Sequence, residues 1–243
     1  MKEKQASPPW WPDLTRIARE KFGRSVRIVI ENDPDKKYML HITRTGRRVT
    51  LNVNLACRHA LDLMFNGNYA EAVFEHENAH LTAPGHHYWE VEPDSPLFPV
   101  REVARIRYYQ FSNFLIAMIR DSIANAVLQS QTLQRFLEFE VCKIEDHEAR
   151  SPFVIENLLW VTEVKLCADM RRLSIRGLEE NSSAILGQSS ILQDIHQIAY
   201  ALFKKAWFAS EKASQEIDLV SETQALREYV LKHTPILFER MRA

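Results

Sequence analysis

The change in hydrophobic period partway along the chain is the feature that most limits its fold. Apolar and polar residues alternate in three short runs, at 26–31, 38–43 and 48–53. This alternation is typical of strands that bury one face. After Asn54 the period becomes helical and stays helical. We therefore expect an α+β protein, with a small N-terminal antiparallel or mixed sheet followed by a motif helix and a mostly helical C-terminal half.

Residues that interrupt regular structure predict where the elements end. Gly23 closes an amphipathic helix that starts at Trp10, and turns at 33–35 and 45–46 separate the strands. The remaining helices are expected at 55–65, 69–82, 100–128, 132–147, 152–173, 189–213 and 215–232, with a loop at 85–99 and a polar linker at 176–188. We expect a core at residues 10–130 and a helical extension at 131–243 that packs on it, with one continuous domain as the alternative.

The overall composition limits the partners and the compartment. Of the 243 residues, 46% are hydrophobic and 26% are charged, with a formal net charge of -1. This balance does not indicate nucleic acid as the main partner, although a local basic patch stays open. No apolar stretch is long enough to span a bilayer, so no membrane partner is expected. Three widely spaced cysteines and no signal peptide favour the cytoplasm.

The segment from His76 to His80 carries the strongest chemical signal. It reads His-Glu-Asn-Ala-His, the H-E-x-x-H pattern, inside a helix-forming stretch. Histidines four residues apart lie on one helix face, one turn apart, where both rings can bind the same cation. Glu77 points to the side of that pair and can reach a water molecule on the metal without being a ligand. Zinc lowers the pKa of such a water to about 7, and Glu77 would act as the general base.

This motif and its surroundings resemble the zincin metallopeptidases, of a minimal or gluzincin-like kind. The resemblance runs from about Val49 to Asn125 and covers a strand, a helix and the motif helix. It implies a Zn²⁺ cofactor and a peptide or protein substrate. It also implies that an edge strand of the sheet binds the substrate in extended form, for which Val49–Val53 is the expected strand.

The third zinc ligand is open between several residues. His86 lies six residues after His80, as in the metzincin pattern, but Ala83 stands where that pattern has glycine. Asp121 lies on an apolar helix flank, where a carboxylate needs a partner or a metal. Its D-x-x-x-N spacing to Asn125 resembles predicted metallopeptidases in which the aspartate binds metal and the asparagine holds it. The alternative for Asp121 is a structural ion pair, and the other candidate ligands are Glu90, Glu92 and Glu102.

Two functions from different classes follow from these observations. The first is a zinc-dependent hydrolase, expected to be a peptidase, with His76, His80 and Asp121 (or His86) on the metal and Glu77 as the base. The second is a regulatory or scaffolding protein that keeps the zincin fold without peptidase activity, since a fold does not fix a function. In either case the C-terminal helices could bind a partner protein.

Overall fold

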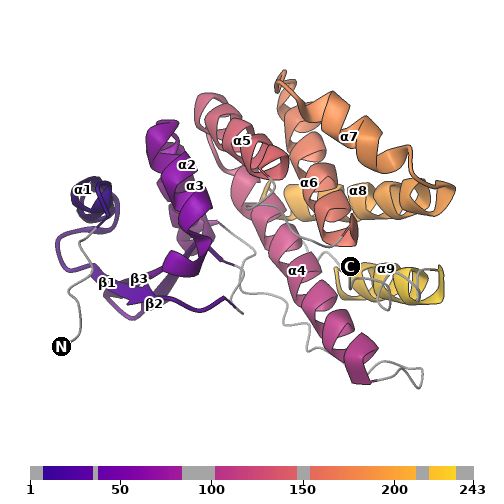
Figure 1. Ribbon diagram of the computed structural model, residues 1–243, viewed down its shortest axis with the longest axis horizontal. Coiled ribbons are helices and arrows are strands. Elements are labelled where there is room, and N and C mark those ends of the chain that lie inside the picture. Colours follow the sequence, from indigo (N-terminus) through magenta and orange to yellow (C-terminus); the bar gives the residue numbers. More distant parts are fainter. Residues whose placement is uncertain (1–7, 35–37, 84–101, 147–153, 212–218, 234–243) are drawn as a thin grey trace. The chain divides into compact units, whose positions relative to one another are not determined.

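The computed structural model describes residues 8–34, 38–83, 102–146, 154–211 and 219–233 (Figure 1). The chain divides into two compact units, at residues 1–82 and 83–243. Unit 1 contains the sheet and the motif helix, and unit 2 is helical in its described part. The α+β class with an N-terminal mixed sheet is therefore confirmed. No helix in the described ranges is long and apolar enough to cross a membrane.

The sheet of unit 1 has three strands in the order β1-β3-β2. These are β1 at Arg27–Glu31, β2 at Leu40–Thr45 and β3 at Arg48–Asn54. β1 runs parallel to β3, and β2 runs antiparallel to it. A two-residue loop, Gly46-Arg47, joins β2 to β3, and Gly46 has a φ of 59°, as the first position of a type II′ turn requires.

The central position of β3 corrects one expectation. The resemblance implied that Val49–Val53 would be an edge strand that receives substrate. This is wrong, because β3 pairs with β1 on one side and with β2 on the other. Val49, Leu51 and Val53 are buried, as the central strand of a small sheet allows. The edge strands among the described residues are β1 and β2.

One face of the sheet carries the apolar side chains and the other carries polar ones. Leu40 pairs with Val53 and Ile42 with Leu51, so these four buried residues share a face. The opposite face presents His41, Thr43, Thr45, Arg48, Thr50 and Asn52, which are exposed or half-buried. The helices of this unit are α1 at Trp11–Phe22, the short 3-10 helix η1 at Leu55–Cys57, α2 at Arg58–Asn66 and α3 at Ala70–Thr82.

Aromatic residues fasten α1 to the helices that follow the sheet. The Trp10 indole donates to Asp62 Oδ1 at 2.8 Å and stacks on Phe65 with 5.2 Å between ring centroids. Phe22 stacks on Phe74 of α3 at 6.0 Å. These contacts hold α3, the motif helix, in a fixed position within unit 1.

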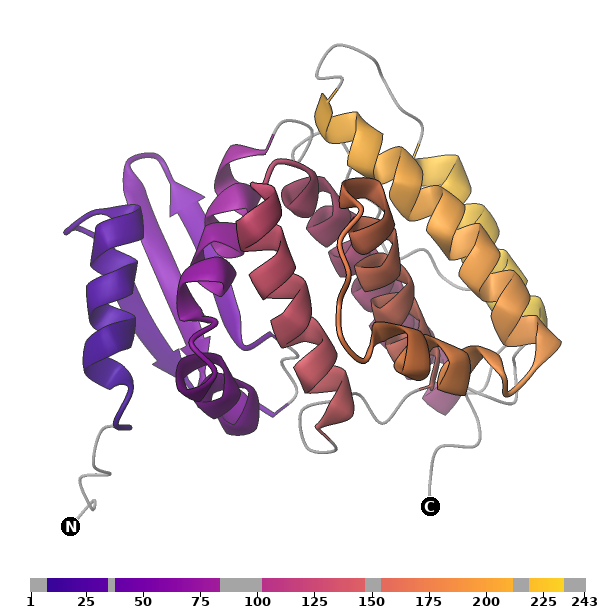
Figure 2. The same cartoon turned by 90° about the horizontal axis from the view of Figure 1, so that it is seen from above.

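Unit 2 is a bundle of helices with a buried apolar core. Its elements are α4 at Glu102–Ala126, α5 at Ser130–Glu145, α6 at Val154–Arg171, α7 at Leu178–Leu186, α8 at Ser190–Glu211 and α9 at Val220–His233. α4 packs against α6 and α8. α8 and α9 lie side by side (Figure 2). The apolar stripe of α8 is core, since Leu202, Phe203 and Ala206 are buried.

α7 lies where a polar linker at 176–188 was expected, so that expectation is wrong. The segment is short and mostly polar, which hides its helical period. Leu178 and Ser182, four residues apart, form its buried face. Gly177 precedes the helix with a φ of 80°, and Glu179 and Glu180 lie in the first turn, where carboxylates favour the helix dipole. Packing on α6 and α8 stabilises the helix.

Candidate metal centre

The motif helix α3 brings the two histidine side chains together. Val73, Phe74 and Ala79 are buried in unit 1, which fixes the rotation of the helix about its axis. As a result His76 is buried, with 4% of its surface exposed, while His80 is half-buried. The H-E-x-x-H segment forms a helix, as its sequence predicts.

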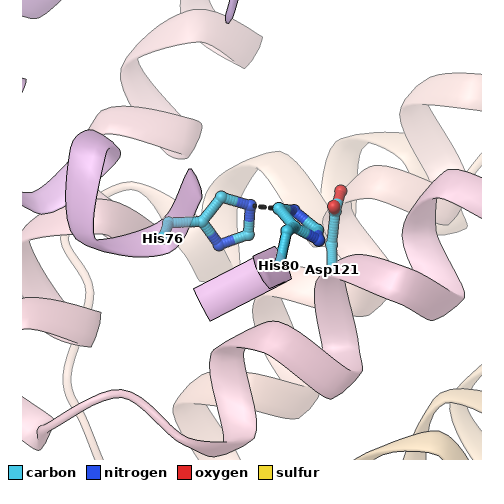
Figure 3. A group of neighbouring side chains, drawn as sticks. All are labelled: His76, His80 and Asp121. Carbon is cyan, nitrogen blue, oxygen red and sulfur yellow. Dashed lines mark hydrogen bonds between the residues drawn. The ribbon is translucent and has the colours of Figure 1, made fainter. Parts of the chain in front are cut away.

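The ring nitrogens of the histidines converge. His76 Nε2 and His80 Nε2 are 3.0 Å apart, and the ring planes meet at 85° with 4.6 Å between centroids (Figure 3). Two nitrogens bound about 2.05 Å from one tetrahedral zinc ion are about 3.3 Å apart. The observed separation is close to that value and also fits a hydrogen bond between two neutral imidazoles. The residues present therefore fit the donor pair that a zinc ion requires.

Glu77 follows His76 on α3 and is half-buried. A residue next to a ligand on a helix projects about 100° away from it, so the Glu77 side chain leaves α3 to the side of the histidine pair. Reaching a water molecule there requires only this lateral position. The geometry of α3 is consistent with the role expected for Glu77.

Asp121 lies in unit 2, on α4, and is half-buried. It is the carboxylate of the expected donor set of two imidazoles and one carboxylate, whose side chains Figure 3 draws. Zinc accepts both ligand types. The other candidate ligands, His86, Glu90 and Glu92, lie outside the described residues, and so does the side chain of Glu102.

A buried polar cluster lies next to Asp121 within unit 2. Asn125, one turn along α4, donates to Glu163 Oε1 of α6 at 2.9 Å, and the Cys167 thiol donates to the same oxygen at 2.9 Å. Burial raises the pKa of Cys167 well above its ordinary value, and the Glu163 and Asp121 carboxylates add to the rise. The thiol therefore stays protonated and acts as a donor.

Glu163 was not among the residues predicted from the sequence. Asn125 was expected to hold the Asp121 carboxylate, and the structure gives it Glu163 as a carboxylate partner. The signal was available: Glu163 stands within the apolar run Leu158–Leu166, where an acidic residue needs buried donors. The contact expected between Asn125 and Asp121 stays a prediction.

Comparisons with known proteins identified no similar protein. No protein-family model, no curated protein and no solved structure matches this chain. The functional argument therefore rests on the residues themselves.

Proposed function

We propose that the chain is a zinc-dependent peptidase in which His76, His80 and Asp121 bind the ion and Glu77 is the general base. The observation that carries the proposal is the 3.0 Å separation of the two Nε2 atoms on α3, the helix on which Glu77 follows His76. Bound there, zinc would supply a Lewis acid that polarises the scissile carbonyl and lowers the pKa of water. Because the three ligands come from both units, the ion would join unit 1 to unit 2.

The protein's own residues have separate roles in this proposal. The histidines and Asp121 would hold the ion, and three protein ligands are the number that catalytic zinc sites use. Glu77 takes a proton from the attacking water and delivers it to the leaving amine of the cleaved peptide. Glu163 and Cys167 stay outside the reaction, and through Asn125 they order the part of α4 next to Asp121.

We assign substrate binding to the edge strand β2. β2 packs against α3, so it lies beside the motif helix within unit 1. Asn54 donates its backbone N–H to Met39 O, which continues the ladder with β3. In this register the backbone groups of His41 and Thr43 face β3, whereas those of Leu40, Ile42 and Arg44 point to the outer edge. An extended peptide would pair with that outer row.

We also propose that the protein functions in the cytoplasm. Cys57, Cys142 and Cys167 are all free thiols, and Cys167 is buried. A reducing compartment keeps thiols in this state.

The test combines metal content with hydrolysis of a fluorogenic peptide mixture. Wild-type protein purified with zinc should hold about one ion and cleave peptides. Glu77→Gln should keep the zinc and lose at least about a hundredfold in kcat, the scale of a general-base contribution. Zinc that stays bound without any hydrolysis by the wild type would instead favour the regulatory or scaffolding function.

A second pair of variants tests the third ligand. Asp121→Ala should lower the zinc content and the zinc affinity, because it removes a ligand. Asp13→Ala is the matched control, since Asp13 is an exposed aspartate at the start of α1. Full zinc affinity in Asp121→Ala would exclude this residue as a ligand and return the assignment to His86.

A further inference from the structure

Six arginines gather at one end of the sheet in unit 1. β1 is parallel to β3, so both strands begin at the same end, and the β2–β3 loop turns there too. The C-terminal end of α1 leads directly into β1 and brings two more arginines. A shallow hollow of about 410 Å³ is lined by Arg19, Glu20 and Arg24. The arginine cluster consists of Arg19, Arg24, Arg27, Arg44, Arg47 and Arg48, all of them exposed.

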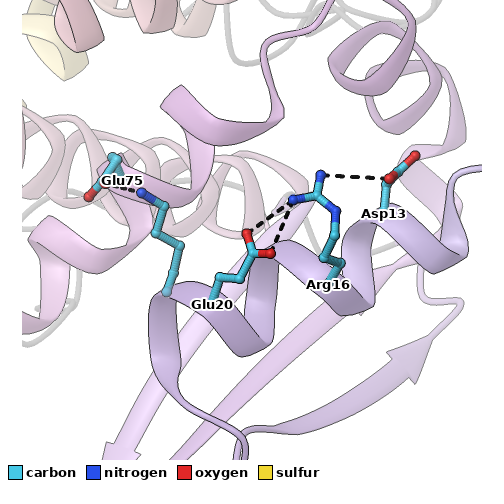
Figure 4. Close-up of polar contacts among 5 residues, drawn as sticks. Asp13, Arg16, Glu20 and Glu75 are labelled. Atoms are coloured by element: carbon cyan, nitrogen blue, oxygen red, sulfur yellow. Dashed lines mark hydrogen bonds and ion pairs between the residues drawn. The ribbon is translucent and has the colours of Figure 1, made fainter.

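The nearby carboxylates are bound to other cations. Arg16 contacts Asp13 at 3.7 Å and Glu20 at 3.0 Å, and Lys21 pairs with Glu75 of α3 (Figure 4). Within the described residues, no arginine of the cluster makes an ion pair. Six positive charges thus lie at one end of the sheet, with Arg27 and Arg48 on its polar face and Arg44 on the other face, in a chain whose net charge is only -1. A local excess of this size requires an anionic partner or a solvated surface.

The side chains around the cluster are suited to phosphate groups. Arg27 is paired with Thr50 and Arg48 with Thr45, so the hydroxyls of both threonines share a sheet face with these guanidinium groups. A guanidinium binds two oxygens of one phosphate, and hydroxyls also donate to phosphate oxygens. Arginine is the residue preferred for such contacts over lysine.

The same surface is poorly suited to single-stranded nucleic acid and to a membrane surface. Phe22, the aromatic residue between Arg19 and Arg24 in sequence, stacks on Phe74 of α3 and so does not offer its ring to an unpaired base. In the described part of unit 1, the large hydrophobic residue that is exposed is Ile30, toward the opposite end of β1. A membrane-surface site would combine basic residues with apolar side chains that insert between lipids.

We infer that the arginine cluster binds the phosphate backbone of double-stranded DNA. The contacts are to the backbone, so binding is independent of base sequence. The inference does not depend on zinc or on hydrolysis, because Arg27, Arg47 and Arg48, which the test replaces, belong neither to the candidate metal centre nor to the outer row of β2.

The test is fluorescence anisotropy of a labelled duplex of about 24 base pairs with the full chain. Wild-type protein should bind in about 50 mM salt and lose affinity steeply toward about 200 mM, as counterion release requires. The triple substitution Arg27→Gln, Arg47→Gln, Arg48→Gln should weaken binding at least about tenfold. It should also reduce the slope of log affinity against log salt by up to about 2.7, since three phosphate contacts are removed.

The matched control removes three charges elsewhere. Arg58→Gln, Arg172→Gln and Arg176→Gln replace exposed arginines outside the cluster and should change the affinity less than about twofold. Circular dichroism and zinc content should match wild type in both triple variants, which separates lost binding from lost folding. Equal losses in the two triple variants, absence of duplex binding by wild type, or tighter binding to single strands or anionic vesicles would each overturn the inference.

Discussion

Asn54 shows how one buried amide fixes the exit of the sheet. Its Nδ2 donates to Asp33 O at 2.9 Å, and its Oδ1 accepts from the backbone N–H groups of Asp33 and Ala56 at 3.1 Å. The side chain thereby ties the chain after β1 to the start of η1, directly after β3. The residue is fully buried, so water cannot replace these contacts in the folded state.

Replacing this residue gives the first prediction. Asn54→Ala leaves two backbone N–H groups and one carbonyl without their partner and should cost about 2–4 kcal/mol of unfolding free energy. Asn52→Ala is the control on the same strand, because its half-buried amide makes one longer bond of 3.3 Å to His41 O. Urea unfolding of both variants measures the difference, and equal losses would contradict the role given to Asn54.

The site residues differ in how far sequence could find them. His76 and His80 could be predicted because both lie on one helix, where a spacing of four residues alone sets the direction of the rings. Asp121 lies on another helix, in the other unit, and no local pattern reports the distance between elements far apart in sequence. Glu163 illustrates the same limit, since its partner Asn125 is 38 residues away.

Elements were predictable where period and turn residues agree. The three strands and α1 follow from alternation and from Gly23. The strand order could not be predicted, because the hydrophobic alternation of β3 is the same for a central strand as for an edge strand. α7 was missed because its helical state depends on packing against α6 and α8 more than on its own residues.

The outward-facing backbone groups of β2 allow a test of substrate pairing with this strand. Arg44→Pro removes an outward-facing N–H while leaving the ladder to β3, so the Michaelis constant for peptides should rise about threefold to tenfold, as for one lost hydrogen bond. Arg44→Gln keeps the N–H and should leave that constant nearly unchanged. If the Michaelis constant of the glutamine variant rises as much as that of the proline variant, the loss of charge and not the loss of strand pairing is responsible.

The contact between α6 and α8 should make stability depend on pH. The Thr162 hydroxyl donates to Leu158 O at 2.7 Å, so it accepts a hydrogen bond from His196 Nδ1 at 2.8 Å. Burial lowers the pKa of His196 from 6.5, Lys165 lowers it further, and Asp169 opposes them. His196 therefore binds a proton at a higher pH in the unfolded chain than in the folded one. The neutral ring contributes its full stabilisation above about pH 6.5, and this stabilisation is lost as the pH falls through the folded pKa.

Removing the titrating ring isolates this contribution. Wild type should lose more unfolding free energy than His196→Gln between about pH 7.5 and pH 5.5, because glutamine stays neutral in both states. Urea titrations of the two proteins at several pH values give the difference, in which the other histidines cancel. Parallel losses would show that His196 has the same pKa in the folded and unfolded chains.

The whole molecule consists of two compact units, and a shared metal ion would couple their unfolding. Each unit has its own core: Leu14, Leu51 and Phe74 are fully buried in unit 1, and Leu115 and Phe203 in unit 2. Each core can support a separate unfolding transition. An ion that takes two ligands from α3 and one from α4 would couple the two, because it binds only when both units are folded.

Calorimetry tests this coupling through the metal. Zinc at about a hundred times its dissociation constant adds about 2.7 kcal/mol to a folded state that alone binds it. In zinc the two units should unfold together. After chelation unit 1 should melt separately and about 10–20 °C lower, since each kcal/mol shifts the midpoint by about 4–8 °C for a domain of its size. Asp121→Ala in zinc should resemble the chelated wild type, since loss of the carboxylate leaves both histidines on one unit. A chelator that leaves the transitions in place would exclude an ion shared by the two units and leave zinc, if it binds, to unit 1 alone.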